Sequence, residues 1–480
     1  MPVAIDMQSH VDHDLPHRSA RDTSKLTKQD EERLVQLYYS HFHQTHPILV
    51  PLSRYAFQAY PPHVRSVIYF IGSHYTPAFS SAQLQEDVDS LLAGPQEPSV
   101  FLVQAQILFA IALHARDDWT KASATLSRAV DLAVELGLNL RDAASKYAGQ
   151  DETLVESFRR TWWELYVVDG YLAAVHRQAT FKCNSVQLDA HLPCEDSAYC
   201  EGIHSTPPTT LEDFDARFFS DTNRIFASAC YRVETIRILA RVLALAAASM
   251  DGPDDIQSVD NAIVAWRLHL PDSKASVIDR FGAVDQMMLQ AFGFIHSATI
   301  ILHFPRSELL LRLPNATDIE CAGGMIPASP TSAQHATKAI AASKDISDLA
   351  ALPISKYSPL FVCSLIFGCI VQLSACSAHA HSCLVQHRDR VALMTGVLKS
   401  LGRHWPVSGD TLRRLNTIAS GIFRPLQSLQ SSTNSPSLHD SGIDIDAMLN
   451  DLCWFDLFPP GIASDQSTMD VTNIDGWPVQ

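Results

Sequence analysis

Closely spaced cysteines are the first thing that this sequence lacks. No cysteine precedes Cys183, and none of the ten cysteines belongs to a Cys-x-x-Cys pair. Structural zinc sites need thiolate or imidazole ligands at short spacing, and disulfide frameworks need paired cysteines in an oxidising compartment. The cysteines here stand singly, several within apolar runs, as expected of buried thiols in a reducing compartment. The sequence therefore predicts no metal site, no cofactor and no disulfide framework.

Catalytic and nucleotide-binding signatures are also lacking. No Gly-x-Ser-x-Gly motif, phosphate-binding loop or Gly-x-Gly-x-x-Gly motif occurs, so nothing in the sequence indicates an enzyme. Positive charge is scarce too, because the net charge is −16 and the longest basic runs are Arg159-Arg160 and Arg413-Arg414. Affinity for nucleic acid comes mainly from neutralised phosphates, and this balance therefore disfavours direct binding to DNA.

A leader or a membrane-spanning segment is not expected. The opening residues, MPVAIDMQSHVDHD, are polar and acidic, unlike a secretory signal. The longest uncharged apolar stretch, residues 360–373, is about 14 residues long and too short to cross a bilayer. We expect this stretch to form a buried core helix and predict no membrane partner.

Helical periodicity is what the sequence has in quantity. Apolar residues recur at steps of three and four, which predicts one buried stripe: Trp119, Ala122, Leu126, Ala129, Ala133 and Leu136. Gly137 follows where a left-handed helix cap is expected. Clusters of Pro, Gly and Ser at 92–98, 201–210, 251–255 and 313–330 indicate loops between helices. The sequence therefore predicts an all-α fold.

The densest pattern is RRTWWELYVVD at residues 159–169. Two adjacent tryptophans in an apolar helix each need a large matching pocket. Asp169 and Arg177 are spaced so that a carboxylate and a guanidinium could meet across the helix end. We interpret the residues of this signature as holding the fold rather than contacting a ligand: Arg160, Trp162, Trp163, Asp169 and Arg177.

This pattern, with the Leu192-Pro193 pair after it, resembles the fungal-specific transcription factor domain, the helical regulatory region of fungal binuclear zinc-cluster regulators. Similar segments follow in the family's order: 34–57, 103–113, 119–142, 265–271, 301–306 and 358–372. The resemblance implies one large multi-helix regulatory domain over residues 30–425, after a disordered segment 1–29. Two departures stand out. His176-Arg177-Gln178 replaces the usual Gly-Arg-Pro, and the family's N-terminal six-cysteine zinc cluster is absent.

The resemblance implies a transcription regulator located in the nucleus. Without the zinc cluster, such a protein would reach DNA through a DNA-binding transcription factor or a homo- or heterodimer partner; loss of a zinc-cluster segment from the gene model is the alternative. The helical region of this family is implied to help regulators pair and sometimes to sense a small-molecule effector. Such regulators are often associated with fungal biosynthetic gene clusters, so control of a secondary-metabolite cluster is expected.

Two histidine-rich segments have metal-ligand residue types at unsuitable spacing. In HFHQTH, His43 and His46 are neighbours on a helix, but His41 points elsewhere and no carboxylate accompanies them. The spacing of the second segment, CSAHAHSCLVQH, matches no common closed zinc site; its candidate ligands are Cys376, His379, His381, Cys383 and His387. We interpret both segments as structural or surface features.

The composition changes near residue 425. Residues 426–442 are polar and serine-rich, which indicates a disordered linker. Residues 443–480 contain no Lys or Arg and interleave acids with bulky apolar side chains, a pattern typical of a disordered acidic segment that activates transcription through coactivators. The residues assigned to it are Asp444, Asp446, Leu449, Asp451, Leu452, Trp454, Phe455 and Asp456. A tail packed on the helical body through Trp454 and Phe455 is an equal alternative.

Two classes of function remain open. The first is a transcription regulator, and the acidic tail favours an activator. The second is a helical scaffold or small-molecule-binding protein with no direct role in transcription. In that second class, an apolar pocket is expected beneath Trp162, Trp163 and Phe181.

Overall fold

The computed structural model describes residues 26–202, 208–219, 224–248, 252–309, 332–354, 356–378 and 381–428. The chain divides into two units, Met1–Arg424 and Pro425–Gln480. The predicted all-α fold is confirmed, because the described residues form seventeen α-helices and no strand. The predicted acidic segment 443–480, and the predicted linker after residue 428, lie outside the described residues.

The described α-helices follow one another along the chain. They are α1 (Lys28–Tyr38), α2 (Leu52–Tyr55), α3 (Pro62–Ser73), α4 (Ser81–Ala93), α5 (Val100–Ala115), α6 (Trp119–Glu135), α7 (Ala143–Ala148), α8 (Glu152–Val175), α9 (Asp196–Glu201), α10 (Leu211–Asp215), α11 (Ser228–Ala248), α12 (Pro253–Leu268), α13 (Gln286–His303), α14 (Ser332–Ala350), α15 (Phe361–Ala378), α16 (His381–Leu401) and α17 (Pro406–Ser428). Five single-turn elements complete the list: a π-helical turn η1 (Tyr39–His43) and the 3₁₀ turns η2 (Lys182–Ser185), η3 (Ala216–Phe218), η4 (Asp272–Lys274) and η5 (Phe304–Arg306).

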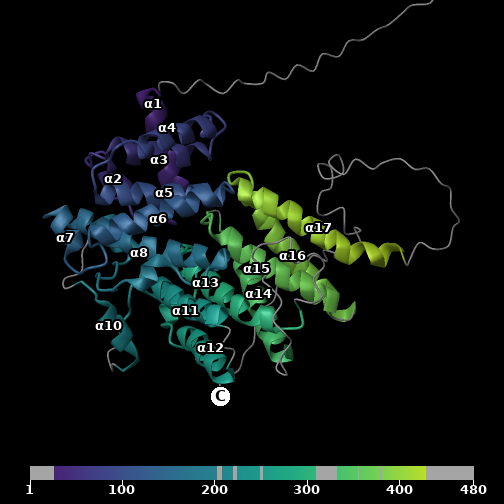
Figure 1. Ribbon diagram of the computed structural model, residues 1–480. Helices are drawn as coiled ribbons and strands as arrows, with labels where there is room; N and C mark the ends of the chain where they lie inside the picture. Colours follow the sequence, from purple (N-terminus) through teal and green to yellow (C-terminus); the bar gives the residue numbers. More distant parts are fainter. Residues whose placement is uncertain are drawn as a thin grey trace, which may run out of the picture. The chain divides into compact units, whose positions relative to one another are not determined.

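The helix α8, which carries the signature, packs against α5 and α6 on one side and against α11 on the other (Figure 1). Asp151 caps its start by accepting the backbone N–H of Leu154. Trp162 is fully buried and Trp163 is 2% exposed. The helix α8 is buried on all of its faces from Phe158 to Val168 apart from the half-buried Arg159. Its buried charged side chains, Arg160 and Glu164, are ion-paired.

The helix α6 shows how local sequence signals set the bounds of an element. Asp118 caps its start by accepting the backbone N–H of Lys121, and the predicted stripe buries Ala122, Leu126, Ala129 and Ala133. Gly137 has a φ of +73°, so the predicted left-handed residue follows the helix as expected. The stripe faces α5, which is buried along almost its whole length.

The later helices pack in succession, α13 against α11 and α14, and α15 against α14 and α16. The predicted core stretch 360–373 lies in α15 and is buried. The expectation that residues 360–373 are the longest uncharged apolar stretch is wrong, because Gln286–Arg306 is longer and is apolar enough to cross a membrane by length and composition. The structure buries 89% of its apolar window inside the protein, which is the position of a core helix.

Candidate functional site

Glu164 of α8 forms a buried polar network with elements that are distant in the sequence. Its carboxylate accepts a hydrogen bond from His46 Nδ1 at 2.7 Å, and Arg232 of α11 donates to both carboxylate oxygens at 2.6 and 3.0 Å. On the far side of the ring, His46 Nε2 accepts from Ser358 Oγ at 2.9 Å. His46, Glu164 and Arg232 are at most 4% exposed.

Electrostatics keep Glu164 charged and His46 neutral. Burial acts to raise the pKa of Glu164, but Arg232 and His46 outweigh burial and lower this pKa to about 2. Burial lowers the pKa of His46, although the hydrogen bond to Glu164 opposes the change. The network therefore pairs one carboxylate with one guanidinium and satisfies both nitrogens of a neutral imidazole. It joins the segment after η1 to α8 and α11.

Arg160, one turn before Glu164, forms a second network that holds the chain segment before α9. Its guanidinium donates to Glu156 Oε1 at 2.9 Å, to Asp196 Oδ1 at 2.5 Å and to the carbonyl oxygen of Cys194 at 2.7 Å. The guanidinium carbon also lies 4.3 Å from the ring centroid of Tyr199. Such a planar fork of donors can hold several acceptors at once, which a lysine cannot.

The other signature residues have separate positions in the structure. Trp163 Nε1 donates to the carbonyl oxygen of His191 at 2.8 Å, which adds a further tie to the segment held by Arg160. The expected pair of Asp169 and Arg177 is not formed. Asp169 instead accepts the backbone N–H of Cys183 at 2.9 Å. Arg177 lies beyond the end of α8 with a φ of +56°, which turns the chain and leaves its side chain exposed.

A cleft of about 960 Å³ lies beside these networks, and Asp196, which Arg160 holds, is part of its lining. We call it the α9 cleft. Its lining comes from four segments, within residues 43–47, 195–200, 272–286 and 353–356. Asp196 and Tyr199, both in contact with Arg160, form part of one wall. The arrangement of α8 therefore fixes one side of the cleft.

A short hairpin-like loop forms another wall of the α9 cleft. Ile278 and Val284 are joined by an antiparallel bridge, and the Asp279 carboxylate accepts the backbone N–H groups of Phe281 and Ala283, each at 2.8 Å. Gly282 sits in the turn with a φ of +83°, a conformation that favours glycine. The loop is therefore ordered by its own hydrogen bonds and presents the Phe281 ring, which is 79% exposed.

Charged groups at the cleft are mostly tied to one another. Lys274 Nζ lies 2.5 Å from Glu195 Oε1 and 2.6 Å from Ser228 Oγ. Burial raises the pKa of Glu195, and the bond to Lys274 opposes this change. His43 also lines the cleft, and burial lowers its pKa to about 4, so its ring is neutral at physiological pH. The neutral ring therefore adds no positive charge to the cleft.

Gln286, the first residue of α13, departs from this pattern of satisfied groups. Its side-chain Nε2 donates to the carbonyl oxygen of Lys356 at 3.2 Å. Its Oε1 is buried and has no hydrogen-bond partner among the described residues, although the side chain lines the α9 cleft. A buried acceptor without a donor is costly, which makes this oxygen a position where a bound molecule would be stabilised.

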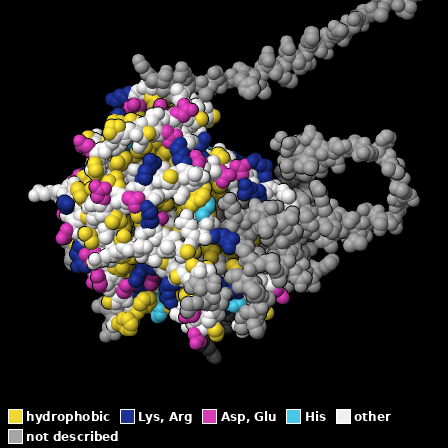
Figure 2. All heavy atoms as spheres, in the orientation of Figure 1, with side chains coloured by type: hydrophobic (Ala, Val, Ile, Leu, Met, Phe, Trp, Pro, Cys, Tyr) yellow, Lys and Arg dark blue, Asp and Glu magenta, His cyan; other side chains and the backbone are white. Residues whose placement is uncertain are grey.

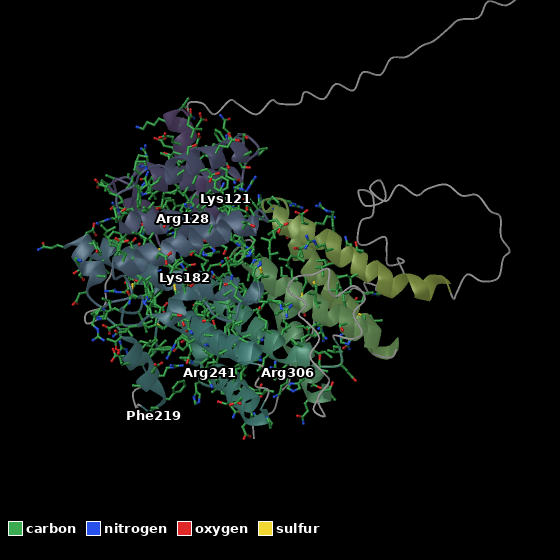
Figure 3. The ribbon with its side chains drawn as sticks, viewed as in Figure 1. Lys121, Arg128, Lys182, Phe219, Arg241 and Arg306 are labelled. Atoms are coloured by element: carbon green, nitrogen blue, oxygen red, sulfur yellow. The ribbon has the colours of Figure 1, made fainter. Side chains whose placement is uncertain are left out.

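A second cavity, of about 310 Å³, corrects the pocket expected from sequence. Phe181 lines it as expected, but Trp162 and Trp163 do not, because both are buried inside the packed core; the other walls include Trp119, Asp169 and Lys182. Lys182 lies beneath α6, which carries Lys121 and Arg128 (Figure 3). Its ammonium bonds to Asp131 of α6 at 2.8 Å.

The histidine-rich segments have structural partners where they are described. His41 stacks on Tyr75 with 4.6 Å between the ring centroids, and His43 Nε2 donates to the carbonyl oxygen of Leu49 at 2.8 Å. His387 bonds to Gln372 Oε1 at 2.6 Å. Within the part of the chain that the structure describes, no group of three or more His, Cys, Asp or Glu is arranged to hold a metal ion.

Sequence reasoning missed the residues that carry most of this geometry. Glu164 lies inside the quoted signature, but only its partner in space, Arg232, distinguishes it from a surface acid. Gln286 has no sequence signal at all. The assigned residues of the acidic segment, from Asp444 to Asp456, lie outside the described residues.

Comparison with known proteins adds a family to this geometry. Residues 35–268 match the fungal specific transcription factor domain. The C6 finger domain transcription factor iacK of Pestalotiopsis fici (strain W106-1 / CGMCC3.15140) is 32% identical over 413 residues. That likeness covers 84% of this chain and 61% of the relative, so the chain spans less than two thirds of the relative's length. No solved structure matches.

Proposed function

Because residues 35–268 form a fungal-specific transcription factor domain, we propose that this chain is a transcription regulator that acts in the nucleus. The observation that carries the proposal is this match, extended over 84% of the chain by the likeness to a relative named as a transcription factor. The networks of Arg160 and Glu164 lie within the matched region or join it to later elements. They give the regulatory domain one fixed core.

The proposed route to DNA is a partner protein, either a DNA-binding transcription factor or a homo- or heterodimer partner. Two features favour it. On the described part of the face in Figure 2, basic and acidic side chains are interspersed rather than gathered by sign. The net charge of −16 opposes association with phosphate.

The proposed output is activation of genes in a biosynthetic cluster for a secondary metabolite. The composition of residues 443–480 supports activation, since acids that keep bulky apolar groups solvated leave them free to bind a coactivator. The proposal that the target genes form a biosynthetic gene cluster follows from the family resemblance. The α9 cleft adds a candidate site for a small-molecule effector, because its volume of about 960 Å³ suits a ligand of drug-like size.

Chromatin occupancy of the tagged full-length protein tests this proposal, together with transcript levels. We expect occupancy restricted to a few promoters. An activation variant replaces four apolar residues of the acidic segment with alanine: Leu449, Leu452, Trp454 and Phe455. A matched control replaces four later apolar residues of the same segment: Met469, Val471, Ile474 and Trp477.

The expected result is that the activation variant loses target transcripts but keeps occupancy, while the control variant keeps both. Dependence of occupancy on a second protein, identified by co-purification and deletion, would support the partner route. Binding of the purified chain, without any other protein, to naked target DNA would contradict that route. Absence from chromatin, with the protein in the cytoplasm, would overturn the regulator proposal and favour a scaffold or small-molecule-binding protein.

A further inference from the structure

The α9 cleft contains one buried acceptor that the protein itself leaves unsatisfied. Gln286 is 9% exposed, its Nε2 is fixed by the carbonyl oxygen of Lys356, and its Oε1 has no partner. The hydrogen bond at Nε2 sets the orientation of the amide, so the free atom is the acceptor and not the donor. The complement of this atom is an N–H or O–H donor on a ligand.

Charge in the cleft favours a positively charged donor. Five carboxylates and two basic side chains line it: Glu195, Asp196, Asp272, Asp279 and Asp285, with Arg280 and Lys356. Lys274 and Arg160 neutralise Glu195 and Asp196 from behind the lining. Lys274 also lies 3.7 Å from Asp285 Oδ2. With Lys274 and Arg160 included, the five carboxylates still outnumber the four basic groups by one. Asp285 also caps α13 by accepting the backbone N–H of Met288, which offsets the positive end of that helix.

Apolar side chains form a second part of the surface, beside polar ones such as Gln44, Ser197 and Ser276. The apolar side chains come from three of the four segments: Pro47, Val277, Ile278, Phe281, Pro353 and Ile354. Phe281 is exposed, so a ligand seated in the cleft would remove part of its ring from water. The hydrogen bonds of the hairpin-like loop fix the backbone that carries this ring, which lowers the entropic cost of using it.

We propose that the α9 cleft binds an organic ammonium ion with an apolar body. The ammonium donates to Gln286 Oε1 and lies among the carboxylates, and the apolar body packs on Phe281 and its neighbours. The binding site stands on the geometry alone. Its role as the site of an effector rests on the proposed function in transcription.

The test measures binding of two fluorescent probes to the purified full-length chain by fluorescence anisotropy. Dansylcadaverine carries a primary ammonium, and dansylglycine carries a carboxylate on the same fluorophore. We expect saturable binding of dansylcadaverine, with a Kd about tenfold or more below that of dansylglycine, the value of one charge-assisted hydrogen bond. Equal affinities, or a preference for dansylglycine, would overturn the proposal.

Two pairs of variants locate the site. Gln286→Leu removes the free acceptor, and its control is Gln290→Leu one turn later. Gln290 is also buried with an unpartnered Oε1, donates to the carbonyl oxygen of Thr45, and does not line the cleft. We expect about tenfold weaker dansylcadaverine binding for Gln286→Leu and no change for Gln290→Leu.

The second pair keeps the test decisive if a buried substitution prevents folding. Phe281→Ala truncates an exposed ring at the cleft, and Phe219→Ala truncates a ring that is 93% exposed and lies near α10, away from the cleft lining (Figure 3). We expect weaker binding of the ammonium probe only for Phe281→Ala. Unchanged binding in both Gln286→Leu and Phe281→Ala would overturn the assignment of the site.

The two proposals fail in different ways. A chain that binds dansylcadaverine at this cleft but never occupies chromatin would keep the binding site and overturn the regulator. A chain that occupies promoters but shows no preference for the ammonium probe would overturn only the ligand. Comparison of Gln286→Leu with Gln290→Leu connects the binding site to the regulator. If only Gln286→Leu changes the target transcripts while chromatin occupancy stays intact, this would support an effector role for the cleft.

Discussion

His46 and Glu164 are 118 positions apart in the sequence, yet their Nδ1 and Oε1 atoms lie 2.7 Å apart inside the protein. Arg232 completes the arrangement by donating to both oxygens of the same carboxylate. The three side chains come from the segment after η1, from α8 and from α11. One carboxylate thus holds together three parts of the helical fold.

Glu164→Gln should lower the free energy of unfolding by about 3 kcal/mol, because it leaves the Arg232 guanidinium buried without a counter-charge. Urea unfolding at pH 7 measures the loss. Since the pKa of Glu164 is lowered to about 2 in the folded state, its stabilising charge is lost only as the pH falls below about 4.5. The difference between the variant and the natural protein should therefore persist from pH 7 to pH 5. Glu135→Gln, at an exposed site in α6, should change the stability by no more than about 0.5 kcal/mol.

Stability should fall as the pH falls below about 6.5. Burial lowers the pKa of His43 and His296 to about 4 and that of His114 to about 3. These rings stay neutral in the folded chain while the unfolded chain binds protons, so acidification favours unfolding. Each ring lowers the free energy of unfolding by up to ~1.4 kcal/mol per pH unit in this window. Urea unfolding at pH 7.5 and 5.5 measures the effect, and an equal stability at both values would contradict it.

The same experiment on His114→Leu isolates one ring. Near pH 5, this variant should lower by about one the number of protons taken up on unfolding, which reduces the slope of the free energy of unfolding against pH. His114 lies in a ring cluster with Trp119 and His176, with 6.2 and 5.4 Å between the centroids, so leucine keeps an apolar group among them. A slope equal to that of the natural chain would assign the proton uptake to other groups.

Gly170→Ala should destabilise the protein by about 1–3 kcal/mol, because a methyl group at this position would lie 2.4 Å from Ile236 and 3.0 Å from Phe181. The glycine lets α8 and α11 approach closely. Gly396→Ala in α16 is the matched control, since nothing lies within 4 Å of its added methyl group. That variant should stabilise the chain by about 0.5–1 kcal/mol through helix propensity. Thermal unfolding of both variants measures the two effects. Effects of the same sign would contradict this account.

Local features of this fold were predictable from the sequence because their causes lie within a few residues. The stripe of α6 and the left-handed Gly137 follow from helical spacing and from the lack of a Cβ. The burial of Trp162 follows from its bulk and from its place among the apolar residues of α8. The resemblance to the family was also predictable from the sequence, and the family match covers residues 35–268.

Pairings between distant segments could not be predicted in this way. Periodicity indicates which face of a helix is buried, but it does not name the helix that covers the face. Helical spacing offers Glu156, four positions earlier, as a partner of Arg160, but it does not reveal Asp196, which lies 36 positions away. The expected pair of Asp169 and Arg177 failed for a local reason, because the chain leaves the helical path after α8 and a backbone N–H lies closer to Asp169. The α9 cleft depends on four separate segments and had no single signal.

Arg160→Lys provides a test of whether α8 positions the wall of the α9 cleft. A lysine cannot reach Glu156, Asp196 and the carbonyl oxygen of Cys194 together, so the variant should lose about 2 kcal/mol of stability. Beyond this loss, the amides of residues 194–199 should exchange with solvent faster, while those of α15 should not. Arg159→Lys is the control, because Arg159 pairs with the outer oxygen of Glu156 at a more exposed position and should cost no more than about 1 kcal/mol. Uniformly faster exchange throughout the domain would mean that Arg160 supports only the global fold. Faster exchange confined to residues 194–199, together with weaker dansylcadaverine binding, would identify Arg160 as a positioning residue for the cleft.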